Sequence, residues 1–354
     1  MRLTKATSIA VAKSLLLAMG ADDDEAQIGA EGLTDANLSG HDSHGIGVLY
    51  MYARSAEAGQ LVLNAELEAR QLGSILKING NAGLGQRIGR EAMASACDIA
   101  AREGVCIASL ANSFHLGRIG AWGEQCADAG FVSVHFVGAI SRSLVAPHFG
   151  REARLTTNPV CIGFPRTNGE APVICDFATS AFAAGKVRLA YEAGKPAPEG
   201  ALCDADGVQT TDAARLFEAP LGALLPMAGH KGYALSVMCE LLGGALAGNA
   251  CGPDRQAPDK IINNMLSIVF DPEKFMPQEV LQKESETLLD WLKQTPPAPG
   301  QDKVLSPGEP EAIARRKRLA EGFEMSDGAW RLLEETGENL GVSASELNRC
   351  ADQG

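Results

Sequence analysis

The sequence predicts an α/β fold that carries mainly helical segments at both ends. Between about residues 75 and 304, segments typical of strands alternate with segments typical of helices, which indicates an α/β core. Residues 1–74 and 305–354 contain mostly helical segments, with apolar residues at three- and four-residue spacings. No repeat of fixed period is present, which argues against a solenoid. We expect 1–74 and 305–354 to form one mainly helical domain and 75–304 to form an α/β domain.

The N-terminal part predicts three helices around one polar segment. Helical spacing of apolar residues extends from about residue 7 to 39 with a break at Gly20, and again over 48–58. The consecutive aspartates at 22–24 suit the start of the second helix, because negative charge stabilises the N-terminal end of a helix dipole. The polar sequence Gly-His-Asp-Ser-His-Gly at 40–45 lies between the second and third helices.

The remaining elements alternate from residue 74 onward. Strands are expected at 74–80, 105–110, 131–137, 157–164, 172–176 and 265–270. Helices are expected at 91–103, 122–129, 232–246 and in the charged tail from residue 309. The sequence Pro-Pro-Ala-Pro-Gly at 296–300 indicates a turn-rich linker before that tail.

Composition argues against several classes of partner. The formal net charge is -13 and no long basic run offsets it, so a nucleic acid is not expected to bind. The apolar segment 8–20 contains Lys13 and is too short to span a bilayer, so no membrane contact is expected. Nine scattered cysteines with no C-x-x-C pair, and no signal-peptide pattern, predict reduced thiols in a cytoplasmic protein without a metal site.

The glycine-rich run at 80–89 invites interpretation as a dinucleotide-binding loop, because it lies between an expected strand and an expected helix. Its spacing does not match. After Gly83 and Gly85 the third glycine of that pattern would stand at position 88, which is Ile88. Glu103, the candidate acid, falls at a helix end and not at a strand end. We therefore interpret the run as a glycine-rich tight turn.

The segment Asp42-Ser43-His44 offers acid–base chemistry. Histidine has the only unperturbed side-chain pKa near neutral pH, so His44 suits giving a proton to an alkoxide and the reverse role as a base. Ser43 offers a hydroxyl that can position a substrate oxygen, and Asp42 can orient an imidazole or cap a helix. The alternative is a helix start with polar caps, and the residues alone leave both interpretations open.

Three further segments suit ligand contacts. His115 to Gly120 pairs Arg118 with two glycines, which suits an approach to phosphate, although an ordinary surface turn has the same composition. The residues 229–232 stand ahead of a long helix, whose N-terminal amides together with Lys231 suit an anion. The residues 176–180 follow a short strand, a common place for ligand groups in α/β proteins. Each signal is weak alone.

Taken together, these segments resemble the malate/L-lactate dehydrogenase family, which is distinct from the Rossmann-type dehydrogenases. The matches are Gly-His-Asp-Ser-His-Gly-Ile at 40–46, His-Leu-Gly-Arg-Ile-Gly at 115–120, Thr-Asn-Pro at 157–159, Asp-Phe-Ala-Thr-Ser at 176–180, Gly-Lys-Val at 185–187, Gly-His-Lys-Gly-Tyr at 229–233 and Pro-Gly-Glu at 307–309. They occur in one order over nearly the whole chain, from about residue 5 to 345, and are far more specific together than singly. The segments 131–137, 220–225 and 231–235 resemble one branch of the family, whose members reduce 2-oxo acids.

The resemblance implies a non-Rossmann α/β core of mixed sheet and helices that binds NAD or NADP, and a homodimer with the active site near the subunit contact. It implies interconversion of 2-oxo and 2-hydroxy carboxylic acids, with His44 as the proton donor for reduction and Ser43 and Lys186 beside it. The expected cofactor contacts are His44, Arg118, Ile119, Gly120, Ile174, Cys175, Asp176, Phe177, Ala178, His230, Lys231, Asn264, Gly308 and Glu309. The expected substrate contacts are Thr157 and Arg142.

The sequence departs from the family pattern at two positions. Many relatives have an arginine four residues after the catalytic histidine, where it can hold the substrate carboxylate, and here that position is Val48. The candidate replacement cations are Arg54, Arg118, Arg142 and Lys186. Members that reduce imines carry an acid where this chain has Lys186, so the lysine favours an anionic oxo acid.

Three other functions are considered. A cyclic imino acid reductase of the same family is disfavoured by Lys186, and an inactive nucleotide-binding relative is disfavoured by the Ser43-His44 pair. A zinc hydrolase is disfavoured because no paired ligands with H-E-x-x-H spacing occur. The physiological acid, and the choice between NAD and NADP, stay open at this point, because the pocket for the adenosine ribose is not located by spacing.

Overall fold

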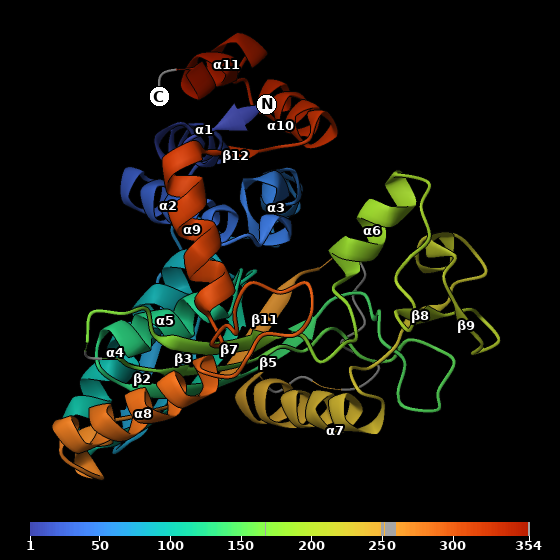
Figure 1. The fold of residues 1–354 in the computed structure, drawn as a ribbon. Coiled ribbons are helices and arrows are strands. Elements are labelled where there is room, and N and C mark those ends of the chain that lie inside the picture. The colour runs from blue at the N-terminus through green and yellow to red at the C-terminus, as the bar shows by residue number, and fades with distance from the viewer. Residues whose placement is uncertain (167, 249–250, 252–259, 353–354) are drawn as a thin grey trace.

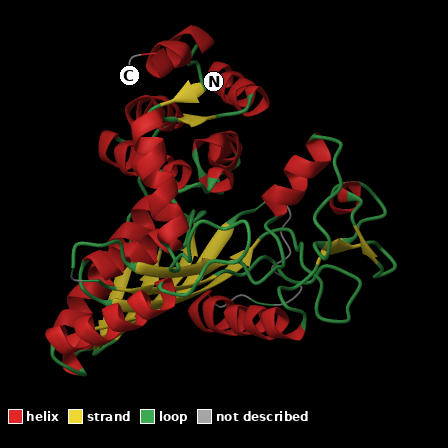
Figure 2. Ribbon diagram, in the orientation of Figure 1, coloured by secondary structure: helices red, strands yellow, loops and turns green. Residues whose placement is uncertain are grey.

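A computed structural model describes residues 1–166, 168–248, 251 and 260–352. Its centre is a seven-stranded mixed sheet with helices on both faces, and further helices gather at one end of the molecule (Figures 1 and 2). The α/β class and the mixed sheet confirm the fold predicted from the sequence. None of the helices in the described part of the chain is long and apolar enough to cross a membrane.

The strands of the large sheet lie in the order β2-β3-β4-β11-β5-β6-β7. Their bounds are Glu68–Leu72 for β2, Ile75–Asn79 for β3, Val105–Ser113 for β4, Val132–Ile140 for β5, Val160–Phe164 for β6, Val173–Phe177 for β7 and Ile262–Phe270 for β11. Among these strands β3 and β4 form the parallel pair, and every other neighbouring pair is antiparallel. A doubly wound nucleotide-binding sheet is mainly parallel, so this sheet has a different architecture.

Helices cover the two faces of the sheet (Figure 1). On one face α4 (Gly85–Glu103) packs on β4, and α5 (Gly120–Asp128) packs on β5 and β6. On the other face α7 (His230–Cys239) continues into a π-helical segment, Glu240–Leu246, that packs on β5 and β11. The additional helix α8 (Gln278–Lys293) runs along the sheet, and α6 (Ala184–Glu192) leads to a small sheet of β8 (Leu202–Cys203), β9 (Gln209–Thr210) and β10 (Ala223–Leu224).

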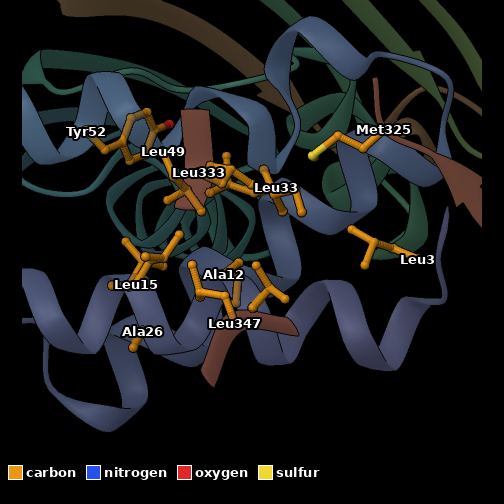
Figure 3. Packing of buried hydrophobic residues seen from close by; sticks show 14 of the residues in the cluster. Leu3, Ala12, Leu15, Ala26, Leu33, Leu49, Tyr52, Met325, Leu333 and Leu347 are labelled. Atoms are coloured by element: carbon orange, nitrogen blue, oxygen red, sulfur yellow. The ribbon is translucent and has the colours of Figure 1, made fainter. Parts of the chain in front are cut away.

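The two ends of the chain pack together. The helices are α1 (Lys5–Met19), α2 (Asp23–Leu38), α3 (Leu49–Glu57), α9 (Glu309–Glu321), α10 (Asp327–Asn339) and α11 (Ala344–Asp352). A short pair of strands, β1 (Arg2–Leu3) and β12 (Phe323–Glu324), joins the ends. One cluster of buried side chains includes Leu15 and Leu33 from the first helices and Leu333 and Leu347 from the last ones (Figure 3). This shared core supports the proposed helical unit of 1–74 and 305–354.

Local sequence signals explain where the first helices begin and end. The Thr4 hydroxyl accepts a hydrogen bond from the Thr7 amide at the start of α1, and Gly20 ends it with φ 105°, a value that favours glycine. The Asp22 carboxylate accepts from the Glu25 amide at 2.7 Å and so caps α2. The expected break at Gly20 and the expected start near residue 22 are both confirmed.

The glycine-rich run occupies the connection between β3 and α4, inside the parallel β-α-β unit, which explains its resemblance to a dinucleotide-binding loop. Its glycines are packed against protein atoms. A Cβ on Gly83 would lie 2.9 Å from the Gly80 carbonyl oxygen, and one on Gly89 would lie 2.5 Å from the Trp122 ring. Because α4 begins at Gly85, the second half of the run is helical, and the expectation of a turn as far as Gly89 is corrected.

Other expected boundaries also change. Helix α4 begins at Gly85 and not at residue 91, and the expected helix at 232–246 becomes an α-helix followed by the π-helical segment. A Cβ on Gly243 would lie 2.5 Å from the Phe136 carbonyl oxygen of β5, so the glycines there allow close packing of this helix on the sheet. Strand β2, helices α6 and α8 and the small sheet were not expected.

Candidate active site

The polar sequence 40–45 forms a tight turn between α2 and α3. Residues Asp42–His44 and Ile46–Val48 are two short 3-10 turns. None of the side chains of residues 40–45 caps α3. The Asn37 side chain holds the turn from inside: its amide nitrogen donates to Asp42 at 2.7 Å, and its oxygen accepts from the Ile46 amide at 2.9 Å. A Cβ on Gly45 would collide with the Asn37 side chain. The turn is therefore built for a fixed shape and not as a helix cap.

One face of α9 fixes the same turn from outside. Arg318 donates to both carboxylate oxygens of Asp42, at 2.6 and 3.0 Å. Glu311, two helical turns earlier, lies 3.3 Å from His41 Nε2. Since Asp42 is engaged by Arg318 and Asn37, it does not orient an imidazole. This assigns Asp42 a role in holding the turn that carries His44.

A hydrogen-bonded chain of four side chains begins at His44. His44 Nδ1 lies 3.1 Å from His115 Nε2, and His115 Nδ1 lies 2.9 Å from the Tyr52 hydroxyl. The Gln86 amide nitrogen lies 3.0 Å from the same hydroxyl. Tyr52 is fully buried, and Gln86 is nearly so. The chain joins four separate elements: the 42–44 turn, the loop after β4, α3 and α4.

Burial changes the proton affinity of this chain. It lowers the pKa of His44 to about 4, with smaller contributions from the positive charges of His41 and Arg118. Burial lowers the pKa of His115 to about 3, with His44 adding to the effect. Burial raises the pKa of Tyr52 above its ordinary value. Both imidazoles are therefore neutral at neutral pH, and the phenol is protonated.

Arg118 is placed differently from what its motif suggested. Its guanidinium is buried and makes two hydrogen bonds to Glu124, at 2.6 and 3.0 Å, and one to Asp35 at 3.2 Å. Arg315 of α9 joins both carboxylates, at 2.9 and 3.0 Å. With its charge balanced by carboxylates, the Arg118 side chain links α5 to α2 and α9. Ion pairs engage this guanidinium, and the phosphate contact expected of it stays a prediction.

The segment from Asp176 to Lys186 lies against the histidine turn at two points. The Asp176 carboxylate accepts from the Gly120 amide at 2.7 Å and interacts electrostatically with His41. A Cβ on Gly185 would lie 3.2 Å from Ser43 Cβ, so the start of α6 adjoins the exposed Ser43. Lys186 follows directly and is exposed. The segment thus meets the turn at His41, through Asp176, and at Ser43, through Gly185.

Two asparagines of β11 connect the sheet to the loop that carries His115. Asn263 accepts from the Leu116 amide at 2.8 Å, and Asn264 accepts from the Asn112 amide at 2.7 Å. The Asn264 amide nitrogen is buried and has no hydrogen-bond partner within the described part of the chain. A buried donor without a partner is costly, so this amide nitrogen keeps a hydrogen-bonding capacity that the described residues do not use.

The other expected contacts occupy several places. Ile119, next to Arg118, is buried and precedes α5, while Ile174, Cys175 and Phe177 lie on edge strand β7 and Ala178 follows it. Gly308 packs against Ile174, whose amide donates to the Pro307 carbonyl at 3.2 Å. Glu309 binds Lys293 and Lys303 at 2.9 and 2.8 Å, and Lys303 in particular lowers its pKa to about 2. Residues 307–309 thus extend the edge of the sheet.

The expected substrate contacts and the helix start of α7 have their own partners in the fold. The Thr157 carbonyl accepts from the Thr179 amide at 2.9 Å, and Arg142 donates to the Leu216 carbonyl at 3.0 Å. His230 and Lys231 begin α7 and are exposed, and His230 lies near His148, with ring centroids 6.0 Å apart. Among the described residues no hydrogen bond or ion pair joins the side chains of Arg142 or Lys231 to His44, and the ligand contacts expected of them stay predictions.

The sequence did not identify Tyr52, Gln86 or Arg318 as members of the site. Tyr52 and His115 are separated by 63 positions, and Arg318 and Asp42 by 276. His115 was noticed only as part of a loop motif. The helix at 48–58 contains two tyrosines, Tyr50 and Tyr52, and its sequence does not show which of them meets a buried partner.

Comparison with known proteins gives a consistent result over the full chain. The sequence profile described as malate/L-lactate dehydrogenase matches residues 4–334. The chain is 41% identical to hydroxycarboxylate dehydrogenase B of Escherichia coli (strain K12) over 340 residues, covering 95% of this chain and 93% of the relative. It is 39% identical to an L-lactate dehydrogenase of Cupriavidus necator, covering 97% and 99% of the two chains. A solved Escherichia coli structure described as a malate/lactate dehydrogenase superposes with a TM-score of 0.95 at 39% identity, covering 100% of this chain and 99% of that one.

Proposed function

The chain belongs to the malate/L-lactate dehydrogenase family and is an oxidoreductase of 2-hydroxy and 2-oxo acids, and we propose that His44 transfers the proton in this reaction. The resemblance to one branch of the family is confirmed by the 41% identity to hydroxycarboxylate dehydrogenase B. The observation that carries the proposal is the hydrogen bond between His44 Nδ1 and His115. It engages one ring nitrogen and leaves Nε2 for a substrate oxygen, because no hydrogen bond to Nε2 occurs among the described residues.

Ser43 and His44 act on the same substrate group in this proposal. Ser43 is exposed next to His44, so its hydroxyl can hydrogen-bond the carbonyl or hydroxyl oxygen that exchanges a proton with His44. The rigid turn, held by Asn37 and Arg318, keeps the pair in place without the substrate. Such pre-organisation favours proton transfer, because no side chain has to reorient during the reaction.

The residues around the site are compatible with a nicotinamide cofactor. The unpartnered amide nitrogen of Asn264 offers a hydrogen bond to a carboxamide oxygen, and it lies on the strand that holds the His115 loop. Residues 176–178 and 307–309 offer backbone groups along the sheet edge, and the exposed side chains of His230 and Lys231 offer hydrogen-bond donors at the start of α7. When bound, the cofactor donates or accepts the hydride at the substrate carbon.

We assign the substrate carboxylate to Lys186. This lysine is exposed, follows the glycine that adjoins Ser43, and carries the positive charge that a carboxylate requires. The guanidinium of Arg118 is occupied by Glu124 and Asp35, and that of Arg142 by a backbone carbonyl, so both are weaker candidates. Val48 packs against the apolar core of the helical unit and carries no charge for the substrate carboxylate.

The homodimer stays a proposal. It is supported by large apolar side chains that are exposed on α8 and on the π-helical segment, including Trp291, Leu288 and Leu246. Such side chains favour burial against a second copy. Sedimentation or light scattering over a range of concentrations checks this, and a monomer at micromolar concentration would overturn it.

The first experiment is a turnover assay of the purified protein with NADH and with NADPH across 2-oxo acids from pyruvate and 2-oxoglutarate to phenylpyruvate. A cyclic imino acid serves as the comparison substrate. We expect oxo-acid turnover that His44→Ala lowers by about 10² to 10⁴-fold, with cofactor affinity, measured by fluorescence titration, nearly unchanged. Turnover of the imine alone would overturn the substrate assignment, and equal loss of turnover and cofactor affinity in His44→Ala would give His44 a structural role.

A further inference from the structure

We propose that Tyr52 supplies a proton to His44 through His115, so that Tyr52 and His115 are positioning residues that act through His44. The inference rests on the proposed function of His44. Its structural basis is the continuous chain from the Gln86 amide to the Tyr52 hydroxyl, to both nitrogens of His115 and to His44 Nδ1, with successive distances of 3.0, 2.9 and 3.1 Å. Each link has the length of a hydrogen bond suited to proton transfer.

The donors and acceptors of the chain define one direction. The Gln86 amide nitrogen only donates, so the Tyr52 oxygen accepts from it and the Tyr52 hydroxyl donates to His115 Nδ1. A neutral His115 then carries its proton on Nε2 and donates to His44 Nδ1. It follows that neutral His44 carries its own proton on Nε2, the nitrogen available to the substrate. The buried end of the chain thus selects the tautomer at the catalytic end.

The proton balance of reduction follows from this direction. Hydride addition turns the carbonyl oxygen into an alkoxide, which takes the Nε2 proton of His44. His44 Nδ1 takes the proton of His115 Nε2, and His115 Nδ1 takes the proton of Tyr52. Both imidazoles end neutral in their other tautomer, and a phenolate remains on Tyr52 next to the Gln86 N–H. A proton from solvent, returned through the same groups after product release, restores the starting state.

The surroundings explain why such a relay suits this site. Burial of the two rings disfavours an imidazolium on either one. At neutral pH, few molecules therefore have the protonated His44 that an ordinary imidazolium proton donor requires. The relay avoids this charge, because each imidazole gains one proton as it loses another. Burial also disfavours the Tyr52 phenolate. The substrate alkoxide is a stronger base than this phenolate, so the proton moves from Tyr52 towards the substrate and the alcohol product forms.

The first test measures tautomers in the protein without any substrate. Nitrogen-15 spectra of histidine-labelled protein, assigned with His44→Ala and His115→Gln, report which ring nitrogen carries hydrogen. We expect Nε2–H on both His44 and His115 in the wild type, and a change at His115 in Tyr52→Phe, which removes the donor to Nδ1. Nδ1–H on both histidines in the wild type would overturn the direction of the chain, whatever the activity of the protein.

The second test measures the proton-transfer step. Tyr52→Phe keeps the ring that packs on Phe114 at 5.0 Å, and Tyr50→Phe on the same helix is the matched control, because no hydrogen bond to the Tyr50 hydroxyl occurs in the described structure. We expect kcat of Tyr52→Phe to fall by about 10²-fold with little change in KM. Rates in mixtures of H2O and D2O should indicate several protons in flight for the wild type and Tyr50→Phe, and fewer for Tyr52→Phe.

The outcomes separate this inference from the function on which it rests. An unchanged kcat and an unchanged solvent isotope dependence in Tyr52→Phe would overturn the relay while leaving His44 as the catalytic group. If Tyr52→Phe lost thermal stability and its KM rose in parallel, Tyr52 would have a packing role only, and this result would also overturn the relay. Absence of oxo-acid turnover in the wild type would instead overturn the proposed function. The tautomer measurement alone would then test the direction of the hydrogen-bonded chain.

Discussion

His44 and His115 stack with their ring centroids 5.2 Å apart and an angle of 21° between the ring planes, while His44 Nδ1 lies 3.1 Å from His115 Nε2. A second imidazole therefore takes the place that a carboxylate often has next to an acid–base histidine. A carboxylate would stabilise an imidazolium on His44. A neutral imidazole does not, and this difference determines how the site should respond to pH.

The rate of oxo-acid reduction should depend little on pH around neutrality. The pKa of His44, lowered to about 4 mainly by burial and then by His41 and Arg118, means that the ring is neutral throughout this range. A neutral Nε2–H donor that is resupplied by His115 and Tyr52 keeps kcat/KM constant to within about twofold between pH 6 and 8.

An imidazolium donor with the same pKa gives a different profile. As pH rises above the pKa, its protonated fraction, and with it kcat/KM, falls about tenfold for each pH unit. Initial rates at constant ionic strength and saturating cofactor distinguish the two cases. A steady tenfold decline per unit between pH 6 and 8 would contradict the neutral donor.

Lys186→Asp should impair turnover of 2-oxo acids. The substitution replaces the cation beside Ser43 with an anion that repels the substrate carboxylate, and we expect kcat/KM to fall by about 10- to 100-fold. Lys195→Asp changes the net charge equally at another exposed position and should leave kcat/KM nearly unchanged. Lys186→Arg should retain part of the activity. Intact oxo-acid turnover in Lys186→Asp would remove Lys186 from the substrate site.

Arg318→Met should lower kcat without unfolding the protein. Arg318 holds both oxygens of Asp42, two residues before His44, so its loss lets the turn shift, and small displacements of catalytic groups cost about tenfold or more in rate. The stability cost should stay near 1 kcal/mol or less, because the ion pair is partly exposed.

The control for this variant lies on the same helix. Arg316→Met removes an exposed arginine of α9 and should leave kcat and the midpoint of thermal unfolding nearly unchanged. Steady-state kinetics and thermal denaturation of both variants provide the comparison. Equal kinetics in Arg318→Met and the wild type would show that Asn37 alone suffices to hold the turn.

Local sequence signals predicted much of the fold. The helix start at Asp22, the helix end at Gly20 and the alternation of strands such as 131–137 are properties of neighbouring residues, and they remain valid in the structure. The pairing of strands was not predictable in this way. β11 lies between β4 and β5, although more than 120 residues separate it from each of them in sequence, so this order depends on contacts that no local pattern encodes.

In the candidate site, too, local sequence signals identified some residues, while contacts between distant residues were not predictable. His44 and Ser43 stand out because their residue types suit proton transfer, and the motif at 115–120 stands out because of its glycines. The ion pairs of Arg118 were not expected, because a cation next to glycines suits a phosphate as well as an ion pair, and only the fold places Glu124 and Asp35 around it. The hydrogen bond between Tyr52 and His115 depends on the packing of α3 against the loop after β4, so the sequence alone did not predict it.

Gly89→Ala should affect stability and not cofactor binding. A Cβ at this position would lie 2.5 Å from the Trp122 ring, between α4 and α5, so one of the helices has to shift, and overpacking of this kind costs about 1–3 kcal/mol. If the glycine-rich run instead bound phosphate, the added methyl group would weaken the affinity for the nicotinamide cofactor. Denaturant unfolding and cofactor titration of the same variant separate the two possibilities. A loss of affinity without a loss of stability would restore the run as a nucleotide site; the packing against Trp122 leads us to expect the reverse.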